Sequence, residues 1–342
     1  MAVIDVQATA VKPKGTQQQL GPVSRLAAVK RGRLAAPLRF CFYGPEGVGK
    51  STLAAHAPDP IWFDLEEGSG RLDVARYQFR DGDGGHVPHT YEEILSGIDD
   101  LLRNPHAFQT LVFDTVDRLE ALLWQWMLAR DSKPGKPIDS IESYGYGKGY
   151  LRAIDEWRAL CVRLDRLRAA RKMSIIFLGH AQVRLYKAPE GEDYDRFNLR
   201  INDKAAGFIK EWTDVTGFCM FEEFGSKLGD DRAKGTSTGR RLLKLERTAA
   251  FDAKSRIALP KEVELDPANP WAPFAQAVND GVNMDPAEIA ALIEAETARI
   301  GDPALTAKVV AFTKETLAKN DTATLHRSLL KLRDMKPATT TP

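Results

Sequence analysis

The feature that most constrains the fold of this chain is the segment at residues 44–51, GPEGVGKS, which fits the pattern GxxxxGK[S/T]. It follows a short apolar and aromatic run at residues 38–43, typical of a buried parallel strand, and precedes a helix predicted to start at residues 49–51 and end before Pro58. In a strand–loop–helix unit of this kind, backbone N–H groups turn toward phosphate oxygens. The set expected to bind a nucleotide is Gly44, Pro45, Glu46, Gly47, Val48, Gly49, Lys50, Ser51 and Thr52.

Within this loop, Lys50 is expected to contact the terminal phosphates and Ser51 to bind Mg²⁺. The predicted ligands are therefore ATP and Mg²⁺. A glycine-rich turn that binds no nucleotide is the alternative, which the strand before the loop and the helix after it disfavour.

The composition is that of an ordinary globular protein, with 43% hydrophobic and 28% charged residues in 342. The formal net charge is +1, so any binding to nucleic acid must come from a local basic surface. The three cysteines, Cys41, Cys161 and Cys219, are far apart and are expected to be buried reduced thiols. We find no signal-peptide or membrane-spanning run and expect the protein to stay in the cytoplasm, that of the host if the chain is phage-encoded.

Three further apolar runs predict strands at residues 61–64, 109–114 and 174–179, the last preceded by an amphipathic helix at 150–172. Strands that alternate with helices predict an α/β fold in which a mostly parallel sheet has helices on both faces. Runs at residues 215–221 and 241–246 surround a Gly- and Lys-rich turn and predict an antiparallel extension of that sheet.

The chain is predicted to divide into five parts: a flexible arm (1–25), the α/β core (26–262), a Pro-rich linker (263–283), a helical C-terminal unit (284–335) and a disordered tail (336–342). Three helices are expected in the C-terminal unit. Asp285-Pro286, Asp302-Pro303 and Asp321 mark their starts, because Asp suits the N-cap of a helix and, in the first two, Pro suits the first helical position.

Acidic residues follow two of the predicted strands. Asp114 ends the run at 109–114, where an acid can hold Mg²⁺ through water; the alternative is that it caps the helix expected from Thr115 onward. Asp64 ends the run at 61–64 and Glu66 and Glu67 follow it, and one of these carboxylates can orient an attacking water. We favour Glu66, the alternative being that these acids only cap or solvate a loop.

With these motifs, the chain resembles the RecA/RadA superfamily of recombination ATPases, closest to phage-encoded ATP-binding proteins that include single-strand annealing recombinases. The resemblance covers residues 36–262 and implies a RecA-like P-loop core, with Glu66 in WFDLEEG as the catalytic glutamate and Asp114 in LVFDT as the Walker B acid. The strand FLGHAQVR at residues 177–184 is similar to the one whose polar end senses the γ-phosphate. Either His180 or Gln182 could be that sensor.

A fourth motif, DAKSRIALP at residues 252–260, is similar to a basic motif of RadA-type proteins that completes a neighbouring subunit's site. The resemblance therefore implies a ring or filament in which Lys254 and Arg256 act in trans on the γ-phosphate. The alternative is a basic, solvated strand end.

Two basic segments could bind single-stranded DNA, since cations neutralise the backbone and aromatic rings stack on bases. The candidates are Lys133, Lys136, Tyr146, Lys148, Arg184 and Lys187. In the alternative interpretation, the tyrosines pack at the core edge and the lysines are only solvated.

The function expected from the sequence is a DNA-stimulated, Mg²⁺-dependent ATPase that acts on single-stranded DNA in phage recombination or annealing, with a single-strand-binding protein as a candidate further partner. The alternatives are a replication helicase or its loader, a small-molecule kinase, for which we see no lid of clustered arginines, and a nucleotide-dependent interaction protein with little turnover.

Overall fold

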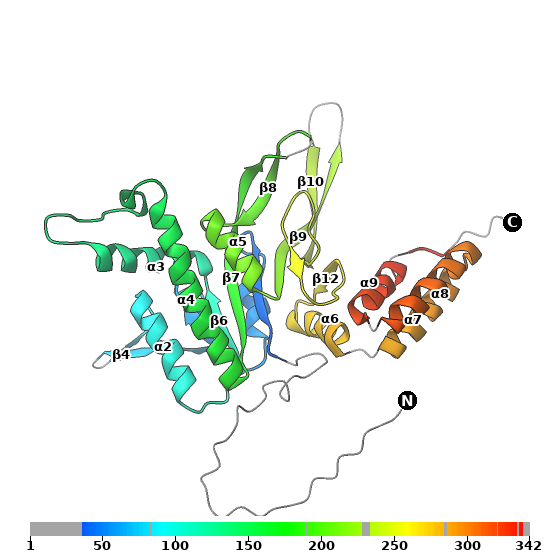
Figure 1. Ribbon diagram of the computed structural model, residues 1–342, viewed down its shortest axis with the longest axis horizontal. Helices are drawn as coiled ribbons and strands as arrows, with labels where there is room; N and C mark the ends of the chain where they lie inside the picture. Colours follow the sequence, from blue (N-terminus) through cyan, green and yellow to red (C-terminus); the bar gives the residue numbers. More distant parts are fainter. Residues whose placement is uncertain are drawn as a thin grey trace, which may run out of the picture. The chain divides into compact units, whose positions relative to one another are not determined.

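The computed structural model describes residues 36–81, 84–188, 191–227, 233–283, 286–319, 321–333 and 335–337 (Figure 1). The arm predicted at residues 1–25, the first residues of the predicted core (26–35) and residues 338–342 of the predicted tail lie outside the described part.

In the described part, ten strands form one sheet, with the order β12-β10-β9-β1-β7-β6-β2-β3 along its main path. Six strands pair in parallel: β1 (Arg39–Gly44), β2 (Pro60–Asp64), β3 (Ala75–Arg76), β6 (Thr110–Asp114), β7 (Ser174–Tyr186) and β9 (Val215–Lys227). Four pair antiparallel: β8 (Tyr194–Leu199) on β7, β10 (Ala233–Lys244) and β11 (Lys254–Ser255) on β9, and β12 (Glu262–Leu265) on β10. The predicted parallel sheet with an antiparallel extension is confirmed.

Alternate residues of each central strand pack into different layers, because side chains in a strand point to opposite faces in turn. Phe40 and Phe42 of β1 belong to the same buried cluster as Leu53 of α1 (Lys50–Ala55), whereas Cys41 and Tyr43 belong to a second cluster. Four helices contribute to this second cluster: α2 (Tyr91–Arg103), α3 (Val116–Asp131), α4 (Lys148–Arg171) and α5 (Asp203–Trp212). The sheet is therefore covered by helices on both faces, as predicted; Figure 1 shows α4 beside β6 and β7.

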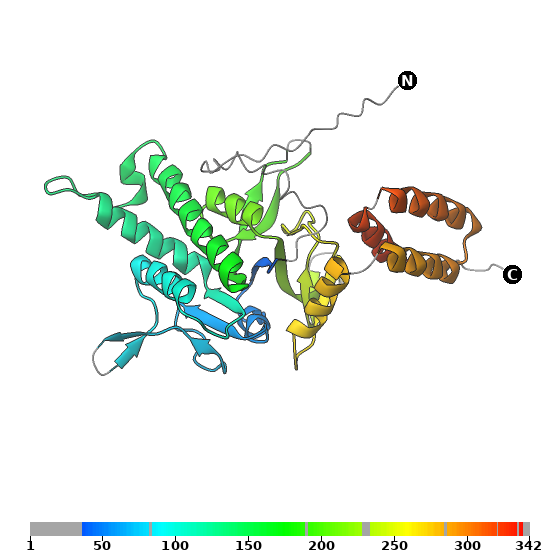
Figure 2. The ribbon, with the colours of Figure 1, turned by 60° about the horizontal axis from the view of Figure 1, so that its bottom comes forward.

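Two small elements connect the larger ones. The strands β4 (Phe79–Asp81) and β5 (Gly84–His86) form a separate antiparallel pair between β3 and α2, visible in cyan in Figure 2. The 3₁₀ helix η2 (Ile141–Tyr144) lies between α3 and α4.

The predicted linker at residues 263–283 is wrong: this segment is part of the packed core. It contains most of β12, which pairs with β10, and the helix α6 (Trp271–Asn283). Phe274 of α6 is fully buried, with its ring centroid 5.5 Å from that of Phe40 and 5.3 Å from that of Phe42. The prolines misled the prediction, because proline is tolerated in the first turn of a helix, and Pro273 lies in the first turn of α6.

Three helices follow: α7 (Pro286–Ile300), α8 (Pro303–Ala318) and α9 (Thr322–Arg333), in orange and red in Figure 2. They enclose a cluster of their own, which contains Ile289, Ile293, Ile300, Leu325, Leu329 and Leu332. Asp302 caps α8 by accepting hydrogen bonds from the backbone N–H groups of Ala304 and Leu305, as its Asp-Pro sequence predicts. No helix in the described ranges is long and apolar enough to span a membrane.

Candidate functional site

The segment at residues 44–51 joins the carboxyl end of β1 to α1, as predicted. Gly47 and Gly49 have φ angles of 72° and 97°, in the left-handed region that side chains disfavour. Gly44 is packed so closely against β9 that a Cβ atom would lie 2.2 Å from the carbonyl oxygen of Cys219. The glycines of this loop are therefore required by its backbone path.

Lys50, the first residue of α1, points back under the loop. Its side chain is nearly buried, and Nζ donates to the carbonyl oxygens of Pro45 at 2.8 Å and Gly44 at 3.0 Å. Burial lowers the pKa of the Lys50 ammonium below its ordinary value. A bound phosphate would supply the opposite charge that favours the ammonium form.

Ser51 and Asp114 connect the loop to the end of β6. Ser51 Oγ donates to Asp114 Oδ2 at 2.8 Å. Burial raises the pKa of Asp114 to about 6, helped by the negative charges of Asp64 and Glu66 and opposed by the Ser51 hydrogen bond. A hydroxyl and a carboxylate are the oxygen ligands that Mg²⁺ prefers, so these two residues fit the ion.

The alternative role of Asp114, as a helix N-cap, belongs instead to Thr115. The hydroxyl oxygen of Thr115 accepts from the backbone N–H of Arg118 at 3.3 Å, at the start of α3. The same hydroxyl donates to Oε1 of Glu66 at 2.6 Å. Glu66 therefore reaches the end of β6 from the loop after β2. Because Thr115 caps α3, the Asp114 carboxylate is available to a metal.

Of the three acids at the end of β2, Asp64 has a structural role. It is buried and accepts hydrogen bonds from the backbone N–H groups of Gly68 at 3.1 Å and Ser69 at 3.2 Å. It therefore stabilises the turn after β2, as in the alternative interpretation. Glu66, the favoured residue, is the one of these acids that lines the pocket described next.

These groups surround a pocket of about 310 Å³ at the carboxyl ends of the parallel strands, where open α/β sheets bind ligands. The residues that line it are Glu46, Gly47, Gly49, Lys50, Ser51, Thr52, Glu66, Gly68, Asp114, Thr115, His180 and Arg241. Of the predicted phosphate-binding set, Val48 is instead fully buried in the core beneath the loop.

The sequence profile of a family described as AAA domain matches residues 36–257, more than half of the chain. This chain belongs to the AAA domain family. The match identifies a P-loop ATPase of the AAA type, a class that binds ATP, typically with Mg²⁺. Among curated proteins, sequence similarity finds no relative of the chain.

In the structure, His180 and not Gln182 lies at the pocket. His180 on β7 lies opposite Gly44 in the register of β1 and β7. Gln182 is two residues further along β7, where its Nε2 donates to the carbonyl oxygen of Leu199 at 3.2 Å. Of the two alternatives for the γ-phosphate sensor, only His180 lines the pocket.

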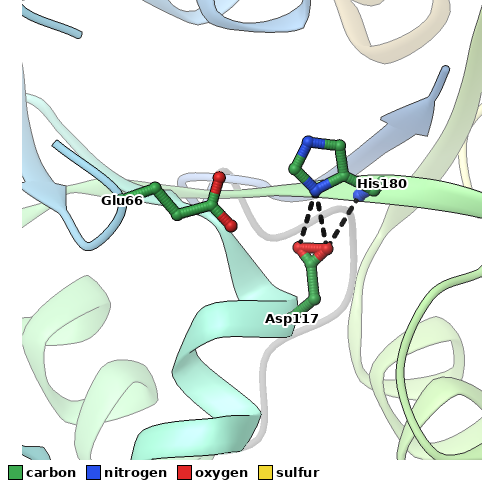
Figure 3. Close-up of side chains that lie close together, drawn as sticks. All are labelled: Glu66, Asp117 and His180. Carbon is green, nitrogen blue, oxygen red and sulfur yellow. Dashed lines mark hydrogen bonds and ion pairs between the residues drawn. The ribbon is translucent and has the colours of Figure 1, made fainter. Parts of the chain in front are cut away.

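His180 belongs to a polar network at the edge of the pocket (Figure 3). Its Nδ1 lies 2.8 Å from Oδ1 of Asp117 on α3, which also accepts the His180 backbone N–H at 3.2 Å. Burial opposes ionisation of Asp117, but the hydrogen bonds, above all that of His180, hold its pKa below the usual value. A guanidinium group completes the network: Arg200 Nη2 lies 3.0 Å from His180 Nδ1, and Nη1 lies 3.8 Å from the Glu46 carboxylate.

Glu66, Asp117 and His180 offer ligand atoms within 4.8 Å of one another, a spacing that could suit a metal ion (Figure 3). The guanidinium of Arg200 already lies against two of the three, with Nε 3.6 Å from Asp117 Oδ1. We therefore interpret the cluster as the polar wall of the nucleotide pocket and not as a second metal centre.

Sequence reasoning missed three residues of the AAA domain that lie at or beside the pocket: Asp117, Arg200 and Arg241. The position of Asp117 in the first turn of α3, three residues after Asp114, was a usable signal. Arg200 and Arg241 carry no local signal. Arg200 follows β8 and Arg241 lies on β10, and the partners of these strands, β7 and β9, meet β1 only in the folded sheet, from positions far along the sequence.

Lys254 and Arg256, predicted to act in trans, are engaged within their own chain. Lys254 Nζ donates to the carbonyl oxygens of Lys210, Glu211 and Thr213 at the C-terminal end of α5, at 2.6, 3.0 and 3.0 Å. Arg256 Nη1 lies 3.4 Å from Asp214 Oδ1 and Nη2 donates to the Glu211 carbonyl. These contacts are those of a helix C-cap, so a trans role would require both side chains to leave α5.

Lys254→Met should therefore lower the free energy of unfolding by about 1–2 kcal/mol, because the carbonyls at the end of α5 lose a charged donor. Chemical denaturation measures this, with Lys308→Met on the exposed surface of α8 as the control. Unchanged stability would contradict the capping role. The trans role stays a prediction: a mixture of Lys254→Ala and Lys50→Ala chains would regain hydrolysis only if one chain completes another's site.

The residues predicted to bind DNA in the segment between α3 and α4 are exposed. Lys133 and Lys136 flank a turn, Lys148 begins α4, and Tyr146 is fully exposed at 101%. A neighbouring tyrosine does pack at the edge of the core, as in the alternative interpretation: the hydroxyl of Tyr144 donates to the Met127 carbonyl at 3.1 Å.

The second predicted DNA segment is the antiparallel pair of β7 and β8, here called the β7–β8 ribbon. Lys187 follows β7 and is exposed. Arg184 is bound to Asp203 at the start of α5, so only part of its charge is available to another partner. Contact with DNA remains a prediction for both segments.

Proposed function

We propose that this AAA domain binds Mg·ATP in the phosphate-loop pocket, hydrolyses it, and couples hydrolysis to the binding of single-stranded DNA. The observation that carries the ATPase part is the convergence of two short hydrogen bonds in one pocket: Ser51 to Asp114 at 2.8 Å and Thr115 to Glu66 at 2.6 Å. A metal-binding pair and a candidate base thus lie together beside the loop lysine.

In the proposed mechanism, each residue has one task. Lys50 neutralises charge on the transferred phosphoryl group, and Ser51 with Asp114 would hold Mg²⁺. When bound, Mg²⁺ would supply further positive charge to the phosphate oxygens. Glu66 orients the attacking water with the carboxylate oxygen that Thr115 leaves free, and His180 contacts the γ-phosphate.

The DNA part is supported by the path of β7. This strand carries His180 at the pocket and continues without a break to Tyr186 in the β7–β8 ribbon, which stands out beyond the helical layers in Figure 1. Two apolar side chains of the ribbon, Val183 at 54% and Leu185 at 61%, are exposed. A change at His180 on hydrolysis would pass along the strand to this surface.

We further propose that the task of this ATPase is recombination or strand annealing, as the resemblance to the RecA/RadA superfamily implies. In that case several copies assemble on DNA as a ring or filament. Support for this step comes from the sequence motifs alone, so it depends on the outcome of the DNA experiments below.

The ATPase proposal predicts that Glu66→Gln keeps ATP binding within a few-fold of wild type but lowers the hydrolysis rate about 100-fold, because the amide cannot accept a proton from water. Phosphate release and binding of a fluorescent ATP analogue measure the two effects. Glu67→Gln, one residue further on and exposed, should keep the wild-type rate. Equal rates for wild type and Glu66→Gln would remove Glu66 from the mechanism.

The DNA proposal is tested by the same assay with and without an oligothymidine. Single-stranded DNA should raise the hydrolysis rate of the wild type several-fold. Tyr146→Ala and Lys187→Ala should each weaken DNA binding about tenfold while leaving the DNA-free rate unchanged. No effect of DNA on hydrolysis, together with no binding, would leave the ATPase assignment intact and overturn the DNA role.

A further inference from the structure

Arg241 brings a second cation to the phosphate loop from a strand of the antiparallel extension. It lies on β10, opposite Phe221 of β9, and its guanidinium carbon is 5.8 Å from the centroid of the Phe221 ring. Leu243, two residues further along β10, is buried in the same cluster as Leu53 of α1. Because side chains two apart share a face of a sheet, Arg241 lies on the face that α1 and the loop cover.

The adjacent arginine has a different environment. Arg240 is ion-paired on the exposed surface, with Nη2 2.6 Å from Glu222 and Nη1 3.2 Å from Glu264. Two arginines next to each other in the sequence thus have separate roles, one in a surface ion-pair network and one at the pocket. This difference provides a matched control for any test of Arg241.

The side chain of Arg241 extends over the backbone of the loop itself. Nη1 is 3.1 Å, and Cδ 3.4 Å, from the point where a Cβ atom on Gly49 would lie. A side chain at position 49 would therefore press on the guanidinium, so Gly49 allows both the left-handed turn and the approach of Arg241. The guanidinium and the loop line the same pocket.

Arg241 has no hydrogen-bond or ion-pair partner for its guanidinium among the residues that the structure describes. The pocket around it contains three acids, Glu46, Glu66 and Asp114, and one lysine, Lys50, whose ammonium already donates to loop carbonyls. A guanidinium offers five N–H donors in a planar fork that matches phosphate oxygens. Because Arg241 lies beside the loop, its N–H donors are available to a ligand bound by the loop.

We infer that Arg241 binds phosphate oxygens of the nucleotide from within the same chain, as a phosphate-contacting residue in addition to Lys50. This inference rests on the proposed function, because it takes the pocket to be the ATP site. It also assigns a role to the antiparallel extension: β10 completes the nucleotide site of its own chain. The ligand class is a nucleoside polyphosphate, recognised at its phosphates and not at its base.

The test measures binding of a fluorescent ATP analogue, and its competition by ATP and by inorganic tripolyphosphate, in the full chain with Mg²⁺. Arg241→Gln should weaken ATP and tripolyphosphate by the same factor, about 10- to 100-fold, since both lose the same charged hydrogen bonds. Arg241→Lys should recover part of this loss, and Arg240→Gln should bind like the wild type. Thermal unfolding of each variant checks that the fold is retained.

Three results would overturn the inference: wild-type affinity in Arg241→Gln, a loss confined to ATP with tripolyphosphate unchanged, or an equal loss in Arg240→Gln. The second would place the guanidinium against the base, and the third would indicate a general charge effect. If the wild-type chain does not bind ATP at all, the proposed function itself is wrong. If the wild type binds ATP and Arg241→Gln binds it equally well, only the inference about Arg241 is wrong.

Discussion

Lys50→Ala should lower ATP hydrolysis about 100- to 1,000-fold and weaken ATP binding in parallel. Lys50 is the cation at the base of the loop, and removal of one preorganised charge at a phosphoryl-transfer site has an effect of this size. The Lys50 ammonium is bonded to the carbonyl oxygens of Gly44 and Pro45 and so lies within the loop itself. Phosphate release and ATP binding by calorimetry measure both effects.

The control for this substitution is Lys204→Ala. Lys204 lies in the first turn of α5 and is exposed, so it matches Lys50 in residue type and place in a helix but lies outside the pocket. Thermal unfolding should show both variants folded. Hydrolysis at the wild-type rate by a folded Lys50→Ala chain would show that the pocket is not the catalytic site.

Asp114→Asn should have two effects of opposite sign: loss of Mg²⁺-dependent hydrolysis, about 100-fold or more, and a gain in stability of the nucleotide-free chain at neutral pH. The first follows because an amide is a poor ligand for Mg²⁺. The second follows because burial of the charged carboxylate disfavours the native state. The amide oxygen of the substituted side chain could still accept the hydrogen bond from Ser51.

The pH dependence of this stability gain can be stated from the pKa of Asp114, which burial raises from 3.8 to about 6. A raised pKa means that the native state binds the proton more tightly than the unfolded chain. The contribution of Asp114 to stability is therefore fully present below about pH 4 and is lost as the pH rises through 6. The difference between Asp114→Asn and wild type should grow over this window to about 1–3 kcal/mol at pH 7.

Urea unfolding at pH 4, 5, 6 and 7 measures this difference, with Asp155→Asn on the exposed surface of α4 as the control. Mg²⁺ should stabilise the wild type and not Asp114→Asn. A variant less stable than wild type at pH 7, or one that keeps Mg²⁺-dependent hydrolysis, would contradict the role of Asp114 as a metal-binding acid.

Much of the fold could be predicted because local patterns agree with the tertiary structure in the core strands. The apolar run at residues 109–114 ends in Asp114, and the loop glycines have the backbone angles that their residue type suggests. The linker at 263–283 was predicted wrongly, because prolines in a helical first turn resemble prolines in a loop. No local pattern indicates that Phe274 packs against Phe40, more than 200 residues away in the sequence.

The candidate site divides in the same way. Lys50, Ser51, Asp114 and Glu66 were predictable, since each follows a strand end or belongs to a contiguous motif. The choice between His180 and Gln182 required the register of β7 against β1, because a shift of two residues along one strand moves a side chain out of the pocket. The contacts of Lys254 with α5 were equally hidden, since they join residues about 40 positions apart.

The amino-acid sequence by itself determined the phosphate loop, the order of strands and helices and the acids at the strand ends, because these depend on residues that are neighbours in the chain. Only the tertiary structure decided that His180 and Arg241 line the pocket and that Lys254 caps α5. The physical reason is that a sheet brings distant strands together through backbone hydrogen bonds, whose register depends on packing of the whole core.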